Sequence, residues 1–187
     1  MRFYLTFVFL ISVVCLSTGQ FRVKAGMTYS DLRLDQDFFP NDYNFGLNYM
    51  VGVEYNFGLS NLIGLETGLD YYRLHNNGQN VEDIQRSYMA IPLIVSFKPN
   101  SLISPGLGFL ASTNASGEPK SIFFKQYDVS AIAKIAVKPF QHIALEIGYN
   151  LGFVPFSELI FTNEFGDEIG KENLHNKFYF LRLSIDL

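Results

Sequence analysis

Residues 143–152 read Ile-Ala-Leu-Glu-Ile-Gly-Tyr-Asn-Leu-Gly, and this stretch decides the fold. Bulky apolar residues alternate with small, polar or charged ones, so the hydrophobic period is two and not the 3.6 of a helix. A β-strand points successive side chains to opposite faces, so one face of this strand is apolar and the other carries Glu146 among small residues. Its ten residues are also the length that a tilted strand needs to cross a bilayer.

Seven further segments of similar length alternate in the same way, namely 21–29, 45–55, 62–72, 86–97, 102–111, 127–137 and 177–187. The connections after the second, fourth and sixth segments are short, whereas those after the first, third, fifth and seventh are long. Outer-membrane barrels have this asymmetry, with short periplasmic turns and longer extracellular loops. The sequence therefore predicts an all-β fold, an eight-stranded antiparallel transmembrane β-barrel with up-and-down connectivity.

The N-terminal residues differ from this pattern. Arg2 precedes an almost purely apolar run over 3–16, and small residues at 17–19 match a cleavage site. We expect a secretory signal peptide over 1–19 and an outer-membrane barrel domain over 20–187. An N-terminal membrane anchor is the alternative, but the apolar run is short for a membrane-spanning helix. Export and the barrel pattern together predict the outer membrane of a Gram-negative bacterium.

Composition excludes several classes of function. The formal net charge of −4 argues against a nucleic-acid partner, because proteins of that class present a basic face. Cys15 is the only cysteine and lies within the expected signal peptide, so the mature chain has no thiol nucleophile and no Cys-ligated metal site. No motif sets up a catalytic triad. We therefore expect no catalytic, cofactor-binding or metal-binding residues, and no enzyme activity.

The two faces of the expected strands differ in composition. In 45–55, 62–72 and 143–152 one face is bulky and uncharged, while the other mixes glycine with Glu or Asp. Glycine weakens a strand and contributes no packing. Inside a narrow eight-stranded barrel, however, it makes room for long side chains from the opposite wall. We therefore expect the bulky face to contact outer-membrane lipid and the charged face to fill the lumen.

The charges expected in the lumen form a candidate ionic network. Its members are Arg22, Lys24, Glu54, Glu66, Asp70, Asp128, Lys134, Glu146, Arg182 and Asp186. Such charges must pair, because an isolated buried ion costs several kcal/mol. The network could serve as a proton or ion path, but a packed ionic plug is favoured because barrels of this size rarely enclose an aqueous channel.

Hairpin symmetry makes some of these pairings specific. A turn centred near Phe140 places Lys134 opposite Glu146, with both side chains facing inward. By the same argument Glu54 lies near Glu66. These two like charges need a cation between them, which the arginine of either the first or the last strand could supply.

Several stretches resemble one known family in order and spacing. Residues 87–97 read Ser-Tyr-Met-Ala-Ile-Pro-Leu-Ile-Val-Ser-Phe and resemble the Ile-Pro-Leu strand of the PorT-like outer-membrane β-barrel family. The segments 128–137 and 144–152 are similar to two later strands of that family. The resemblance implies an outer-membrane location and no catalytic residues, and the named member of the family assists protein secretion. Pro92 cannot donate to a ladder, so we expect a bulge or bend there.

Three functions stay open at this point. The first is a non-enzymatic barrel with a filled lumen, which binds a protein partner through the long extracellular loops 30–44 and 153–176 or assists secretion. The second is a lipid-modifying enzyme of the outer leaflet, which would use His75 or His175 at the rim. The third is a soluble periplasmic ligand-binding barrel, which would need the bulky face inward.

Overall fold

The computed structural model describes residues 19–34, 43–44, 46–78, 84–98, 102–115, 127–155, 157–162 and 168–187. The strands are β1 (Gly19–Leu34), β2 (Tyr43–Asn44), β3 (Gly46–Gly58), β4 (Ile63–Gly78), β5 (Ile84–Phe97), β6 (Ile103–Asn114), β7 (Tyr127–Phe140), β8 (Ile143–Gly152), β9 (Ser157–Thr162) and β10 (Glu168–Asp186). In this described part of the chain, no helix has the length and hydropathy needed to cross a membrane. The expected signal peptide lies outside the described residues apart from Gly19, which begins β1.

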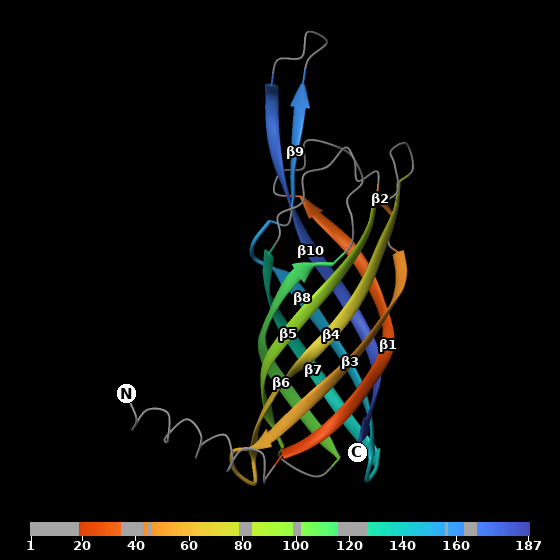
Figure 1. Cartoon of the computed structure of the whole chain (residues 1–187), viewed down its shortest axis with the longest axis vertical. Helices are drawn as coiled ribbons and strands as arrows, with labels where there is room; N and C mark the ends of the chain where they lie inside the picture. The colour runs from red at the N-terminus through yellow and green to blue at the C-terminus, as the bar shows by residue number, and fades with distance from the viewer. Residues whose placement is uncertain are drawn as a thin grey trace, which may run out of the picture.

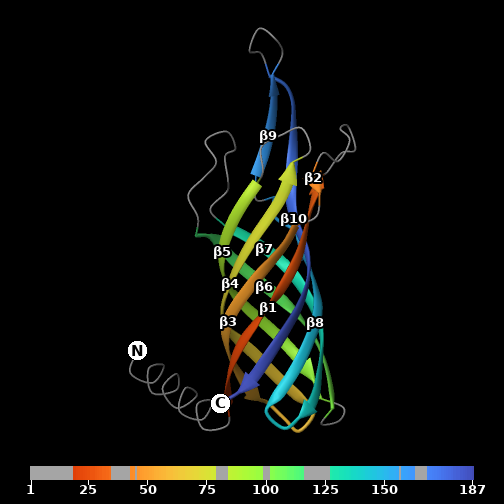
Figure 2. The same ribbon diagram turned by 90° about the vertical axis from the view of Figure 1, so that its right-hand side faces the viewer.

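Eight of these strands close into a barrel (Figures 1 and 2). The order is β1-β3-β4-β5-β6-β7-β8-β10, each strand is antiparallel to the next, and β1 pairs with β10 to close the ring. The prediction of an eight-stranded antiparallel meander barrel is therefore confirmed. Closure leaves no strand edge unpaired, which a structure in lipid requires because no water is present to bond free backbone groups.

Several strands continue past the predicted boundaries at the loop end. Residues 157–162 and 168–176 were expected to be loop, but they form β9 and the first part of β10, which pair with each other. This hairpin projects beyond the barrel rim (Figures 1 and 2). The strand hydrogen bonds continue there because a neighbour is present, as in the pairing of Leu34 with Leu174. Backbone pairing does not require lipid, so hydrophobic alternation alone predicts strands that are too short at the loop end.

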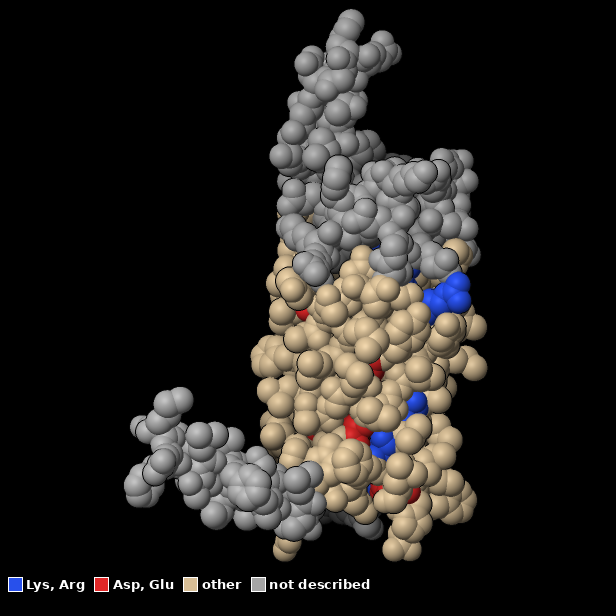
Figure 3. Space-filling model, viewed as in Figure 1, with Lys and Arg blue, Asp and Glu red and all other residues tan. Residues whose placement is uncertain are grey.

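The exterior of the barrel is apolar on every long strand. On β3, the outward residues Leu47, Tyr49, Val51 and Val53 are 45% to 71% exposed. Figure 3 shows that few Lys, Arg, Asp or Glu side chains reach this side of the described barrel. A continuous apolar surface of this extent does not face water in a monomeric soluble protein. The predicted orientation, with the bulky face toward lipid, is confirmed, and the soluble barrel with its bulky face inward is excluded.

Tyr55 belongs to the bulky face of β3 near the turn end, yet only 9% of its surface is exposed. Its neighbours on the same face explain the low exposure. The rings of Phe21 and Phe57 each lie 4.6 Å from the Tyr55 ring in edge-to-face geometry. The three rings form an aromatic cluster at the height where a membrane interface is expected to lie.

Of the bulge or bend expected at Pro92, the bulge is not present. Thr67 pairs with Leu93 and Asp70 pairs with Ala90, so the register between β4 and β5 is the same on both sides of the proline. On its other edge Pro92 stays in the β5–β6 ladder, opposite Leu110. The missing N–H donor is accommodated by an interruption of one ladder, and no extra residue is inserted.

Replacing Ile147 by Arg should test the lipid-facing assignment. Ile147 lies in the middle of β8 and points outward, so the substitution should lower the free energy of unfolding by about 2–4 kcal/mol. Denaturant unfolding in lipid vesicles measures this loss. The control Gln141→Arg, in the exposed turn before β8, should change stability by less than about 0.5 kcal/mol. Equal losses in the two variants would contradict the assignment.

Candidate functional site in the barrel lumen

All ten charged residues proposed for the lumen are buried, and none is more than 8% exposed. The structure joins nine of them in one network in the half of the barrel nearer the short turns, listed as Arg22, Lys24, Glu54, Glu66, Asp70, Lys134, Glu146, Arg182 and Asp186. Asp128 is the tenth, and it lies apart with different partners.

Glu146 is a central acceptor of the network. Its carboxylate accepts hydrogen bonds from Lys134 Nζ at 2.9 Å, from Arg182 Nε at 2.8 Å and from Ser184 Oγ at 3.0 Å. Each charged donor to a carboxylate makes a shorter and stronger bond than a neutral donor does. The side chain is fully enclosed, so these three donors replace the water that the carboxylate loses.

The pairing of Lys134 with Glu146 forms, but in a different register from the one expected. Lys134 lies opposite Gly148, and Glu146 lies opposite Ala136. An irregularity between Val137 and Phe140 moves the turn to residues 141–142. Lys134 therefore pairs with the residue two positions after Glu146. The ion pair therefore bridges a diagonal of the ladder. Gly148, opposite Lys134, makes room for the Phe180 ring, which a Cβ at this position would meet.

Cations separate Glu54 from Glu66, as their like charges require. Arg22 Nη1 lies 3.2 Å from Glu54 and 3.9 Å from Glu66. Arg182 approaches Glu54 at 3.8 Å from across the lumen. Lys24 was not expected as a partner of Glu54, yet its Nζ lies 3.0 Å from that carboxylate. Both arginines and this lysine thus neutralise the carboxylate of Glu54.

The network is balanced in charge within the described residues. The five carboxylates are Glu54, Glu66, Asp70, Glu146 and Asp186, and the five cations are Arg22, Lys24, Lys134, Lys138 and Arg182. Sequence reasoning missed Lys138, whose Nζ lies 2.9 Å from Asp186. Its place at an even spacing after Lys134 and Ala136 could have identified it as inward-facing. A balanced network attracts neither sign of ion strongly.

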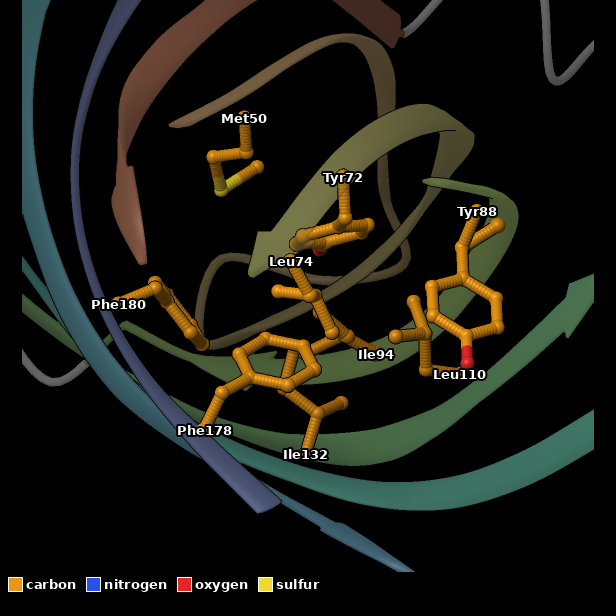
Figure 4. Packing of buried hydrophobic residues seen from close by; sticks show 10 residues of the cluster. Met50, Tyr72, Leu74, Tyr88, Ile94, Leu110, Ile132, Phe178 and Phe180 are labelled. Carbon is orange, nitrogen blue, oxygen red and sulfur yellow. The ribbon is translucent and has the colours of Figure 1, made fainter. Parts of the chain in front are cut away.

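An apolar layer lies in the lumen next to the network, and sequence reasoning did not anticipate it. Figure 4 shows its side chains directed into the space that the strands enclose, and its members are Met50, Tyr72, Leu74, Tyr88, Ala90, Ile94, Leu110, Ile132, Phe178 and Phe180. The layer is joined to the network, because Tyr72 donates a hydrogen bond to Asp70 at 3.0 Å and Arg182 lies 4.8 Å from the Phe180 ring centroid. The same alternation that identified the inward charges could have identified these residues.

A second polar group lies toward the long loops and contains Asp128. Asn176 links it together, because it accepts from Arg86 Nη1 at 2.7 Å and donates to Asp128 Oδ2 at 2.6 Å. The cavity beside Asp128 and Asn150 has a volume of about 10 Å³, which is room for about one water. Ionic network, apolar layer and polar group thus fill the described lumen along its length.

No three or more His, Cys, Asp or Glu side chains are placed to hold a metal ion within the described segments. Lysines and arginines alternate with the lumen carboxylates, so the acidic groups already have cationic partners.

Solved structures with a similar fold include small outer-membrane barrels. Neisserial surface protein A matches with a TM-score of 0.59 at 13% identity, covering 89% of this chain and 97% of that one. Outer membrane protein OprG from Pseudomonas aeruginosa matches with a TM-score of 0.53 at 12% identity, covering 91% and 96%. Yersinia pestis outer membrane protein Ail in a phospholipid bilayer nanodisc matches with 0.51 at 14%, covering 90% and 99%.

These matches show that the chain has the fold of small outer-membrane barrels, and the low identities carry the comparison no further. No protein-family model and no curated protein sequence matches the chain.

Replacing Glu146 by Gln should destabilise the barrel strongly. The change removes one charge and leaves Lys134 and Arg182 partly uncompensated in a closed lumen, at a cost of about 3–5 kcal/mol. Denaturant unfolding in detergent micelles measures the loss. The double variant Glu146→Gln with Lys134→Met restores the charge balance and should lose less than the single variant. A single variant within about 1 kcal/mol of wild type would contradict a coupled network.

Proposed function

We propose that this chain is a non-enzymatic, non-conducting outer-membrane barrel that binds a protein partner at its extracellular end. The filled lumen is the observation that carries the proposal. A balanced ionic network, an apolar layer and a polar group occupy successive parts of the interior. A barrel of this size has an interior just wide enough for side chains, so its surfaces, and not a channel, are available for function.

The hairpin of β9 and the first part of β10 supports a role in partner binding. It extends past the rim, where the barrel itself has no need of it for closure (Figure 1). A paired hairpin holds its shape better than a loop of equal length, because its backbone hydrogen bonds are satisfied internally. The hairpin lies within the segment 153–176, and β1 ends at the same end of the barrel, where Leu34 pairs with Leu174.

The resemblance of residues 87–97 and 144–152 to the PorT-like family supports a more specific form of the proposal. In that form the barrel is an accessory of protein secretion. A closed lumen is compatible with it, because an accessory barrel positions other components and need not transport the secreted protein itself.

The alternative function, a lipid-modifying enzyme, differs from the proposed function in its expected effect on the lipids of the cell. It predicts that deletion of the gene changes the acylation or phosphorylation of outer-leaflet lipids, whereas the proposed function predicts an unchanged lipid profile. Mass spectrometry of extracted lipids distinguishes the two, and a changed profile that the intact gene restores would replace the proposal with an enzyme.

The purified protein should fail to conduct. In a planar bilayer it should give no stepwise conductance at moderate voltage, because ions meet paired charges and then an apolar layer. The folded state is verified first by its different mobility on a detergent gel before and after heating. Regular conductance steps from protein in this folded state would contradict the filled lumen.

Removal of the hairpin should separate folding from partner binding. Replacing residues 157–173 with a short Gly-Ser turn should leave the heat-dependent gel mobility intact, because the barrel pairs of β10 with β1 and β8 remain. Partners recovered from detergent-solubilised outer membranes by wild-type protein should be lost. The matched control shortens the connection 116–126, and it should retain them. Equal recovery by the hairpin variant would exclude the hairpin as the binding surface.

A further inference from the structure

A polar pocket opens at the turn end of the barrel. Figure 1 shows that β1 begins and β10 ends there. Its volume is about 470 Å³, which lies within the ~300–1,000 Å³ range of small-molecule sites. The pocket is lined by residues from the start of β1, the position after β5, the start of β6, the end of β7 and the β7–β8 turn. Its polar lining consists of Gln20, Arg22, Lys98, Ser104, Lys138 and Gln141.

The lining is rich in cations. Arg22, Lys98 and Lys138 all border the pocket, and Asp186 is a carboxylate that both Arg22 and Lys138 contact. Asp186 already contacts Arg22 at 2.5 Å and Lys138 at 2.9 Å. The deeper carboxylates that also contact Arg22 are fully shielded and bind the lysines of β1 and β7. Arg22 and Lys138 belong to the balanced network, so Lys98 gives the wall of the pocket its excess positive charge.

Lys98 is the cation of this group whose partner carries no charge. Within the described residues, its Nζ donates to the side-chain oxygen of Asn56 at 3.3 Å. Burial, followed by the positive charge of Arg22, lowers the pKa of Lys98, and Lys138 acts in the same direction. Glu66 and Asp186 oppose this shift without reversing it. An ammonium in this setting would gain from an anion beside it.

Space and donors are present beside Lys98. A Cβ on Gly64 would lie 3.0 Å from Lys98 Nζ and 2.8 Å from Ser96 Oγ, so the glycine keeps this corner open. Among the described residues, neither Ser96 Oγ nor Asn56 Nδ2 has a hydrogen-bond partner, although both atoms are buried. Buried donors without partners are uncommon. Here two such donors adjoin an ammonium group.

We infer that this pocket binds, from the periplasmic side, a small anion that carries at least two carboxylate or phosphate groups. Lys98 and Lys138 supply charge-assisted hydrogen bonds, which are stronger than neutral ones. Arg22 adds its charge from the floor of the pocket. Two anionic groups match two lysines held on different strands, Lys98 directly after β5 and Lys138 near the end of β7. The inference is independent of the extracellular partner proposed above.

Isothermal titration calorimetry of the folded barrel domain, residues 20–187, in zwitterionic detergent tests the inference at pH 7. Pyrophosphate and citrate are the probes, because one carries only phosphate groups and the other only carboxylates. Saturable binding of either probe is expected. Binding of pyrophosphate alone would identify a phosphate ligand, binding of citrate alone would identify a carboxylate ligand, and each outcome supports the site. Failure of both probes to bind would overturn it.

Variants locate the binding. Lys98→Met should weaken the affinity about tenfold or more, because one charge-assisted hydrogen bond is lost. Lys98→Arg should largely preserve it. The matched control Arg73→Met removes the same charge from β4 near the opposite end of the barrel and should leave the affinity unchanged. Unaltered binding by Lys98→Met would place the probe elsewhere and overturn the inference.

One variant covers the case in which Lys98→Met does not fold. Gln141 lies in the exposed turn and lines the pocket, so Gln141→Glu adds a negative charge without disturbing the barrel. It should weaken binding of both probes, more at low salt than at high salt, because screening reduces the repulsion. Unchanged affinity in this variant would also overturn the inference.

Discussion

Closure of the strands in lipid is the constraint on which the other features depend. A barrel in a bilayer satisfies every backbone donor and acceptor between its own strands, and eight strands leave an interior only as wide as the side chains that fill it. Each inward position therefore needs a side chain that fits the space and whose charge is compensated. The five carboxylates and five cations of the described network meet both requirements, because long ionic side chains fill volume and neutralise one another.

The lumen divides into layers for the same reason. Ion pairs alone are costly in a closed interior, because each charge loses its hydration. The apolar layer around Phe178 and Ile132 fills the next section without this cost. Arg182 is shared between the two sections, since it binds Glu146 and lies against the Phe180 ring. A substitution that disturbs the packing of the apolar layer should therefore also weaken the ion pairs of Arg182.

Alternation and connection length were sufficient to predict the barrel, its strand order and the direction of each face. They could not fix the register of Lys134 and Glu146, because a shift of two residues along the ladder keeps both residues facing inward. They also could not place the upper ends of β4 and β10, where pairing continues beyond the lipid. Alternation places Met50 and Tyr72 inward, but it does not show that residues from separate strands gather at one height into an apolar layer.

The two ends of the barrel differ in a way that follows from its topology. An even number of strands returns both ends of the barrel domain to the turn end, where β1, β10 and the short connections meet. Lys98 and Lys138 border the same pocket as Arg22 at this end, which suits a small, charged ligand. The loop end instead has a paired hairpin that extends away from the rim, which suits a large surface. Because the lumen between them is filled, each end can bind its own ligand without a path that connects the two.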